Sequence, residues 1–145
     1  MTSLSSDVAN IIASYLAEYN LVDWIDIYMI RWHQLCENPL GMDIVKKSPE
    51  RIDWYLLSKN PNAIDILTAN QDCIKWVALS ENPAAIDLLS LNQDKIHWSS
   101  LSKNPSAIDL LSLNQDKINW YMLSANPAIF ELRADSLLIL ELLEV

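Results

Sequence analysis

Glycine is nearly absent from this sequence: a single Gly stands among 145 residues, beside six Pro and six Trp. Sheet proteins normally rely on glycine for tight turns, whereas helical proteins can end their elements with Asn, Ser and Pro. One glycine also excludes a Gly-rich loop of the kind that binds phosphate. We therefore expect an all-α protein without a nucleotide-binding loop.

Cysteine and basic residues are also scarce. The two cysteines, Cys36 and Cys73, occupy different places in the repeat described below. This favours two small buried groups in a reducing compartment over a disulfide or a metal site. Ten Lys and Arg against nineteen Asp and Glu give a net charge of −9. Because a phosphate backbone attracts basic surfaces, we expect no nucleic-acid partner.

Long apolar segments are missing as well. The longest apolar run, "SLLILELLEV" at residues 136–145, is interrupted by Glu141 and Glu144 and is too short to span a bilayer. The N-terminus lacks a cationic segment followed by an apolar core, so we expect no signal peptide. These features predict a soluble cytoplasmic protein that does not bind membranes.

The sequence is dominated instead by a repeat of 22 residues. Three sets of residues recur at this interval: Trp32, Trp54, Trp76, Trp98 and Trp120; Asn-Pro pairs beginning at Asn38, Asn60, Asn82, Asn104 and Asn126; and the acids Asp43, Asp65, Asp87, Asp109 and Glu131. A period of this length indicates stacked units, because one unit cannot bury its apolar face alone and its neighbours complete the core. We therefore predict a short right-handed α-solenoid.

Each unit contains two start signals for helices. Asn-Pro followed by "SAIDLL" places an N-cap residue before a proline at the first helical position. A second start, Asn92-Gln93-Asp94, is replaced in the earliest copy by Ser48-Pro49-Glu50, which is again a capping residue and a proline. The pattern predicts two helices of about nine residues per unit, which only tertiary packing can stabilise at this length.

The recurring apolar positions predict the core. Trp98 and Leu101 form an i, i+3 pair on one face of the first helix, and Ile96 lies on another side. A 3₁₀ turn is also compatible with this spacing. In the second helix the inward positions are Ala107, Ile108 and Leu111. Because each indole can bury roughly 150–250 Å2, we expect the tryptophans to form the enclosed core.

The repeat resembles two groups of known proteins. The unit "LSKNPSAIDLLSLNQDKINWYMLSANP" resembles leucine-rich variant repeats, over residues 38–130, and is more similar to the tandem Asn-Pro/Trp repeats of giant DNA viruses. These resemblances imply a viral interaction protein, in the host cytoplasm or in the virion, and carry no catalytic residues.

The N-terminal segment does not follow the period. "LSSDVANIIASYLAEYNLVDWIDIYMIRWHQLCEN" resembles an F-box, a helical motif that docks onto a Skp-type adaptor of a cullin ubiquitin ligase. The resemblance implies that the adaptor contacts are Leu4, Ile11, Ile12 and Leu16. The alternative is a pair of helices that closes the first repeat, since a solenoid needs a terminal unit with a polar outer face.

The candidate recognition residues are at positions that differ between copies of the repeat, because stacking does not require a particular residue there. Before the tryptophan these include Lys75 and His97, and after it Tyr55 and Tyr121, whose amphipathic rings suit interfaces. His33 and His97 are about three units apart, too far for a shared metal or proton relay. The acidic column predicts a solvated face or, alternatively, a track for a basic peptide.

The complete prediction has three parts: an N-terminal helical cap, F-box-like, at residues 1–37; tandem repeats at 38–130; and a C-terminal capping helix at 131–145. We expect a protein–protein interaction module that is not an enzyme and has no cofactor or metal. The leading hypothesis is a substrate adaptor for a host ubiquitin ligase. The alternative is a structural or virion protein that self-associates. We expect a monomer, or a weak homodimer through the C-terminal helix.

Overall fold

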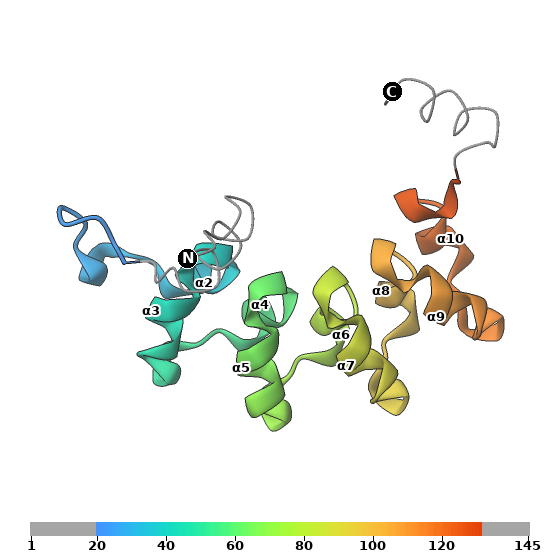
Figure 1. The fold of residues 1–145 in the computed structure, drawn as a ribbon, viewed down its shortest axis with the longest axis horizontal. Helices are drawn as coiled ribbons and strands as arrows, with labels where there is room; N and C mark the ends of the chain where they lie inside the picture. Colours follow the sequence, from blue (N-terminus) through green and yellow to red (C-terminus); the bar gives the residue numbers. More distant parts are fainter. Residues whose placement is uncertain (1–19, 132–145) are drawn as a thin grey trace, which may run out of the picture.

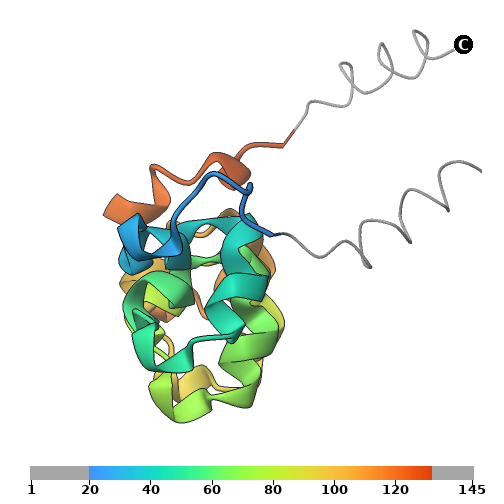
Figure 2. The same cartoon turned by 90° about the vertical axis from the view of Figure 1, so that its left-hand side faces the viewer.

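The computed structural model describes residues 20–131, and all regular structure within them is α-helical or 3₁₀. Successive 22-residue units stand side by side in a curved array (Figure 1). Viewed from the end of the array, the helices form two rows (Figure 2). The structure thereby confirms the predicted helical repeat solenoid.

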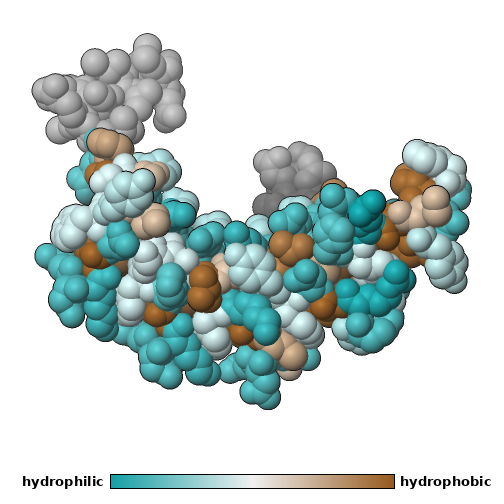
Figure 3. All heavy atoms as spheres, turned by 180° about the vertical axis from the view of Figure 1, so that it is seen from behind, coloured by the Kyte–Doolittle hydropathy of each residue, from teal (hydrophilic) through white to brown (hydrophobic). Residues whose placement is uncertain are grey.

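One row, here the inner row, consists of the helices that begin at the recurring tryptophan. Its members are α2 (Trp32–Glu37), α4 (Trp54–Lys59), α6 (Trp76–Leu79), α8 (Trp98–Leu101) and α10 (Trp120–Leu123). The outer row comprises α3 (Met42–Lys46), α5 (Ile64–Ala69), α7 (Ile86–Ser90) and α9 (Ile108–Ser112). The inner row lies on the concave side of the array (Figure 1), and the space-filling view shows the same curvature (Figure 3).

Short 3₁₀ helices connect the rows. Those that lead from the inner to the outer row begin at the recurring proline: η2 (Pro39–Gly41), η4 (Pro61–Ala63), η6 (Pro83–Ala85) and η8 (Pro105–Ala107). η10 (Pro127–Ile129) begins at the same proline in the last unit, but extended backbone follows it. Those that return are η3 (Pro49–Arg51), η5 (Gln71–Cys73), η7 (Gln93–Lys95) and η9 (Gln115–Lys117), and η1 (Ile27–Met29) precedes the array. Residues 32–37, assigned from sequence to the N-terminal unit, form α2, which contacts α4 as α4 contacts α6.

The helices are shorter than the nine residues predicted. The segment around Ile96 and His97 does not continue a helix: both residues have extended backbone and separate η7 from α8. The physical reason is that His97 caps α8 while Ile96 turns into the core, where it is 8% exposed. The recurring Asn-Pro start is confirmed, because each of these asparagines accepts a hydrogen bond from the amide two residues later.

Leucine rather than tryptophan forms the enclosed core of the units after the first. In the first unit Trp32 is 9% exposed and belongs to the core cluster, as predicted. The fully buried leucines recur with the repeat: Leu57, Leu79 and Leu101 in the inner row, and Leu67, Leu89 and Leu111 in or beside the outer row. Trp54, Trp76 and Trp98 are only partly buried and pack against this cluster, and Trp120 is 63% exposed. The predicted tryptophan core is therefore wrong for these units. Each indole stands at the first position of its helix, at the edge of the row, whereas the leucine three residues later faces between the rows.

Cationic side chains cover several of the indoles. The pairs, each joining a tryptophan to the basic residue 19 positions later, are Arg51 over Trp32 at 4.1 Å from the ring centroid, Lys95 over Trp76 at 4.8 Å and Lys117 over Trp98 at 4.5 Å. The same position in the remaining internal unit is Cys73, which is half-buried. A cation over an indole contributes about 0.5–1 kcal/mol at an exposed site.

The recurring asparagines also join neighbouring units. Asn82 Nδ2 donates to the backbone oxygens of Ser58 at 3.1 Å and Asn60 at 2.9 Å, both in the preceding unit. Asn60, Asn104 and Asn126 repeat this arrangement. We call these four residues the asparagine ladder. These residues are at most 2% exposed, so water cannot reach the backbone carbonyls that they contact. The asparagine side chains supply the hydrogen bonds that these carbonyls would otherwise lack.

A second ladder uses serine. Ser80 Oγ donates to the Trp76 carbonyl within its own helix and accepts from the His97 amide of the next unit at 3.1 Å. Ser58 and Ser102 do the same. Cys36 occupies this column in the first unit and is fully buried, as predicted, with its sulfur 3.4 Å from the Asp53 amide nitrogen. The two ladders fix the register between units.

The repeat ends where its small buried residue is lost. Ala63, Ala85 and Ala107 are fully buried between the rows, and the corresponding residue of the last unit is Ile129. Phe130 follows in an extended conformation, where the earlier units enter an outer helix. An alanine-sized space does not accept isoleucine without displacement of its neighbours. The predicted capping helix at residues 131–145 lies almost wholly outside the described residues.

Candidate functional site

The side chains exposed on the inner row form the candidate site, here called the inner-row surface. It consists of two columns: the residue after each recurring tryptophan (His33, Tyr55, Val77, Ser99 and Tyr121) and the residue before each Asn-Pro pair (Glu37, Lys59, Glu81, Lys103 and Ala125). The helices that carry both columns line the concave side of the array, so residues of successive units stand next to one another there (Figure 1).

The two predicted tyrosines lie in the same column of this surface, three units apart. Tyr55 in α4 is 47% exposed and Tyr121 in α10 is 84% exposed. The Lys59 ammonium lies 5.4 Å from the Tyr55 ring centroid. Each tyrosine therefore presents an aromatic ring on a short helix whose backbone the ladders hold in place.

Lys75 and His97, the other predicted contacts, occupy the N-cap positions of α6 and α8 and are exposed. His97 Nδ1 accepts from the Ser100 amide at 3.3 Å. Asp53 and Asn119 cap their helices in the same way, whereas Lys75 does not. Helix capping thus explains part of the variation at this column, since Asp, Asn and other short acceptors are interchangeable there.

The charge column before Asn-Pro was missed from the sequence. Its residues alternate in sign from Glu37 through Lys59 and Glu81 to Lys103, and the alternation stops at Ala125. Lys59 Nζ lies 3.3 Å from Glu81 Oε2 in the next unit. The residue before each Asn-Pro pair could have revealed this column in the sequence. Its alternating charges form pairs only because the stack places residues 22 positions apart next to each other.

The Lys59 pair gives this surface a pH dependence. Burial lowers the pKa of the Lys59 ammonium, but interactions with Glu81 and, to a smaller extent, with Tyr55 together outweigh burial, so the net pKa is raised. A lysine with a raised folded-state pKa stabilises the fold fully below its unfolded-state pKa, and this stabilisation is lost as pH rises through the folded-state pKa. The pair is therefore intact at neutral pH. Since both side chains are about a third exposed, its contribution is small.

The acidic column belongs to the other row. Asp65, Asp87 and Asp109 are exposed in the first turns of outer-row helices, on the convex side of the array. This position favours carboxylates because the helix dipole is positive there. The acids and the tyrosines are thus on different rows and do not share a site. Within residues 20–131, no group of three His, Cys, Asp or Glu could hold a metal ion.

The predicted adaptor contacts Leu4, Ile11, Ile12 and Leu16 lie outside the described residues. Among the described residues that precede α2, Ile27 and Ile30 pack against the core cluster. Across residues 20–131, no helix is long and apolar enough to cross a membrane.

Comparison with known proteins gave no significant match to a protein-family model, a curated protein or a solved structure.

Proposed function

We propose that this protein is a protein–protein interaction module that binds its partner on the inner-row surface. The supporting observation is the exposure of Tyr55 and Tyr121 on one column of a concave array. Tyrosine carries large contact area with few rotatable bonds, and it is enriched among residues that dominate binding energy. The asparagine and serine ladders hold the units in register, so little order has to be gained on binding.

We further propose that the N-terminal segment recruits a Skp-type adaptor and that the repeats carry the substrate, as in F-box proteins. The support is the resemblance of the segment up to Asn38, together with its physical continuity with the array through Ile27 and Ile30. The matching resemblance of the repeats to those of giant DNA viruses makes the ligase a host enzyme in this proposal.

Affinity capture from host lysate with the full chain as bait tests both halves. Substitution of Leu4, Ile12 and Leu16 by Ser should remove the adaptor and cullin but leave a substrate bound. Tyr55→Ala with Tyr121→Ala should have the opposite effect. If all baits recover the same proteins, or the parent recovers neither cullin nor a partner, the proposal fails.

A matched control is available on the outer row. Leu91 and Leu113 are 84% and 82% exposed, comparable with Tyr121, and follow α7 and α9 directly. Substituting both by Ser removes exposed apolar area without touching the inner row. This control should capture the same partners as the parent chain.

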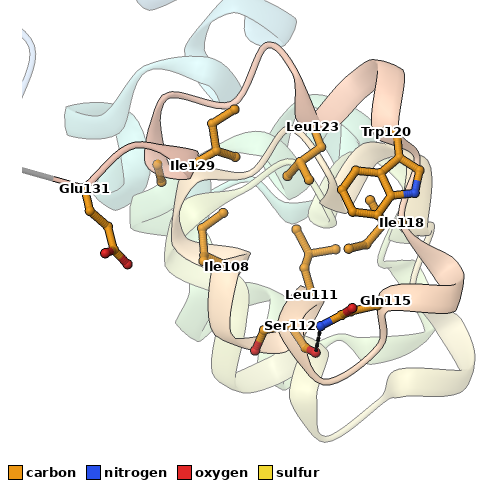
Figure 4. Close-up of a pocket in the computed structure, with 10 residues that line it drawn as sticks. Ile108, Leu111, Ser112, Gln115, Ile118, Trp120, Leu123, Ile129 and Glu131 are labelled. Atoms are coloured by element: carbon orange, nitrogen blue, oxygen red, sulfur yellow. Dashed lines mark hydrogen bonds between the residues drawn. The ribbon is translucent and has the colours of Figure 1, made fainter.

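Self-association is the second candidate, and the C-terminal end of the array supports it. An apolar hollow of about 300 Å3 is lined there by residues of α9, η9, α10 and η10, among them Leu111, Ile118 and Leu123 (Figure 4). In the earlier units η4, η6 and η8 are each followed by an outer helix, whereas extended Phe130 follows η10. Sedimentation velocity over a wide concentration range tests this candidate: a monomer at every concentration contradicts it, and an Ile118→Ser variant should reduce any dimer.

A further inference from the structure

Lys59 of the inner-row surface has two partners within the protein, a carboxylate and an aromatic ring. These partners show which chemical groups suit a lysine at this position of the repeat. The Lys59 ammonium lies 3.3 Å from a Glu81 carboxylate oxygen on one side and 5.4 Å from the Tyr55 ring centroid on the other. The carboxylate comes from the residue 22 positions later, and the ring from the residue four positions earlier. The site therefore satisfies the ammonium with a charge and an aromatic face together.

Lys103 lies at the equivalent position two units later, but the residues that correspond to Glu81 and Tyr55 are neither acidic nor aromatic. The residue 22 positions later is Ala125, and the residue four positions earlier is Ser99. The neighbouring Glu81 is engaged elsewhere, because it pairs with Lys59 and accepts a hydrogen bond from Ser100 Oγ at 3.2 Å. Within the described part of the chain, Lys103 makes no ion pair and no ring contact, and it is exposed.

An open hollow surrounds this lysine. Its volume is about 580 Å3, and it is lined by Lys103, Tyr121, Met122, Ser124 and Ala125. Lys103 supplies a cation at one edge, while Tyr121 and the half-buried Met122 supply an aromatic ring and a polarisable apolar chain. We call these five residues the lysine hollow.

We propose that the lysine hollow binds a partner-protein segment that carries a carboxylate next to an aromatic side chain. The carboxylate replaces Glu81 of the Lys59 site, and the aromatic ring lies against Met122 and Tyr121. This inference rests on the proposed interaction function and specifies the chemistry of the partner.

The charge of the whole chain makes this recognition selective. At a net charge of −9, the protein repels acidic segments at long range. A carboxylate thus gains affinity only where an unpaired cation is close, and the lysine hollow provides one. Charge pairs at an interface discriminate between partners more than they add affinity, and salt weakens them.

The chain itself supplies the variant that tests this proposal. Ala125→Glu places a carboxylate beside Lys103, as Glu81 is placed beside Lys59. The introduced carboxylate should pair with Lys103 and weaken the binding of an acidic ligand. Lys103→Gln removes the cation instead. Ser99→Tyr restores the ring and should weaken binding of an aromatic ligand. All three positions are at the surface or partly exposed, and circular dichroism with thermal melting confirms that each variant folds.

The probes are fluorescein-labelled peptides of sequence Gly-Ser-Glu-Phe-Glu-Ser-Gly and its counterpart with Gln for both Glu. Fluorescence anisotropy measures the affinity of the 145-residue chain, and amide chemical shifts locate the bound peptide. We expect the acidic peptide to shift amides of Lys103, Tyr121 and Met122. Ala125→Glu, Lys103→Gln, the Gln peptide and high salt should each weaken binding by roughly fivefold or more.

Several results would overturn the proposal. These are equal affinity of parent and Ala125→Glu, shifts confined to other units, a preference for the Gln peptide, or no binding at millimolar peptide. The lysate capture described above separates this failure from a failure of the interaction function. If Tyr55→Ala with Tyr121→Ala loses a partner that Ala125→Glu retains, the interaction function stands and the lysine hollow does not. If every variant retains all partners, both proposals fall.

Discussion

The asparagine ladder predicts that Asn82→Asp destabilises the protein far more than the small change of atoms indicates. Asn82 is 1% exposed, and its side chain makes three hydrogen bonds: Nδ2 donates two to carbonyls of the preceding unit, and Oδ1 accepts one from the Ala84 amide at 3.0 Å. Aspartate has the same shape and preserves the accepted bond. It replaces the donor with an oxygen that faces two carbonyl oxygens.

The magnitude follows from these contacts. Two lost bonds are each worth about 1 kcal/mol, and leaving the Ser58 carbonyl buried without this donor costs about 1–3 kcal/mol more. We therefore expect a loss of about 3–5 kcal/mol in the free energy of unfolding, a large share of the roughly 5–15 kcal/mol typical of a domain. Urea denaturation followed by circular dichroism and tryptophan fluorescence measures this loss.

The effect should also depend on pH. Burial and the two carbonyls raise the folded-state pKa of the introduced carboxyl above its unfolded-state value of about 3.9. The deficit relative to the parent is therefore smallest below that value, where the protonated group can again donate one bond, and it grows as pH rises through the folded-state pKa. A deficit that is independent of pH would contradict the assignment of Nδ2 as the essential donor.

Asn62→Asp is the matched control. Asn62 Nδ2 also donates to a carbonyl of the preceding unit, that of Pro39 at 3.1 Å, but this bond is exposed. Water can replace it, so we expect a loss below about 1 kcal/mol. If the Asn62 and Asn82 variants unfold at the same urea concentration, burial of the ladder is not what holds the units together.

Three further predictions concern packing and thiols. Leu79→Ala, at a fully buried leucine, should lower the free energy of unfolding by about 2–5 kcal/mol, whereas Leu113→Ala, at an 82% exposed one, should change it by less than about 0.5 kcal/mol; equal urea midpoints would contradict the leucine core. Gly41→Ala should lower the melting temperature, because the added Cβ would lie 2.8 Å from a backbone oxygen; an unchanged melting curve would show that the rows separate freely there. Burial raises the pKa of the Cys36 thiol, and the Asp53 carboxylate adds to this while its amide hydrogen bond opposes it. In the native protein a thiol reagent should therefore modify Cys73 well before Cys36, and both rapidly in urea; equal native rates would contradict the burial of Cys36.

The architecture could be predicted because every unit repeats the same constraints. Asn before Pro specifies a helix start from local chemistry alone, and all five asparagines cap as predicted. The inward positions Ala107, at the end of η8, and Leu111, in α9, are buried as predicted, whereas Ile108 between them is only partly buried. The other start is also in the predicted place, because η7 begins at Gln93 directly after Asn92. The Asn92 side chain, however, makes no cap bond and instead donates to the Leu88 carbonyl of the preceding helix.

The period, the helical class and the places where helices begin follow from the sequence, since these depend on local backbone chemistry repeated 22 residues apart. Which residues are enclosed follows only from the folded stack, because burial of a tryptophan or a leucine depends on the neighbouring units. The folded stack also shows that one asparagine serves two units and that Lys103 lacks the partners that Lys59 has. Such relations exist only across the stack, where residues distant in sequence lie within hydrogen-bond distance of each other.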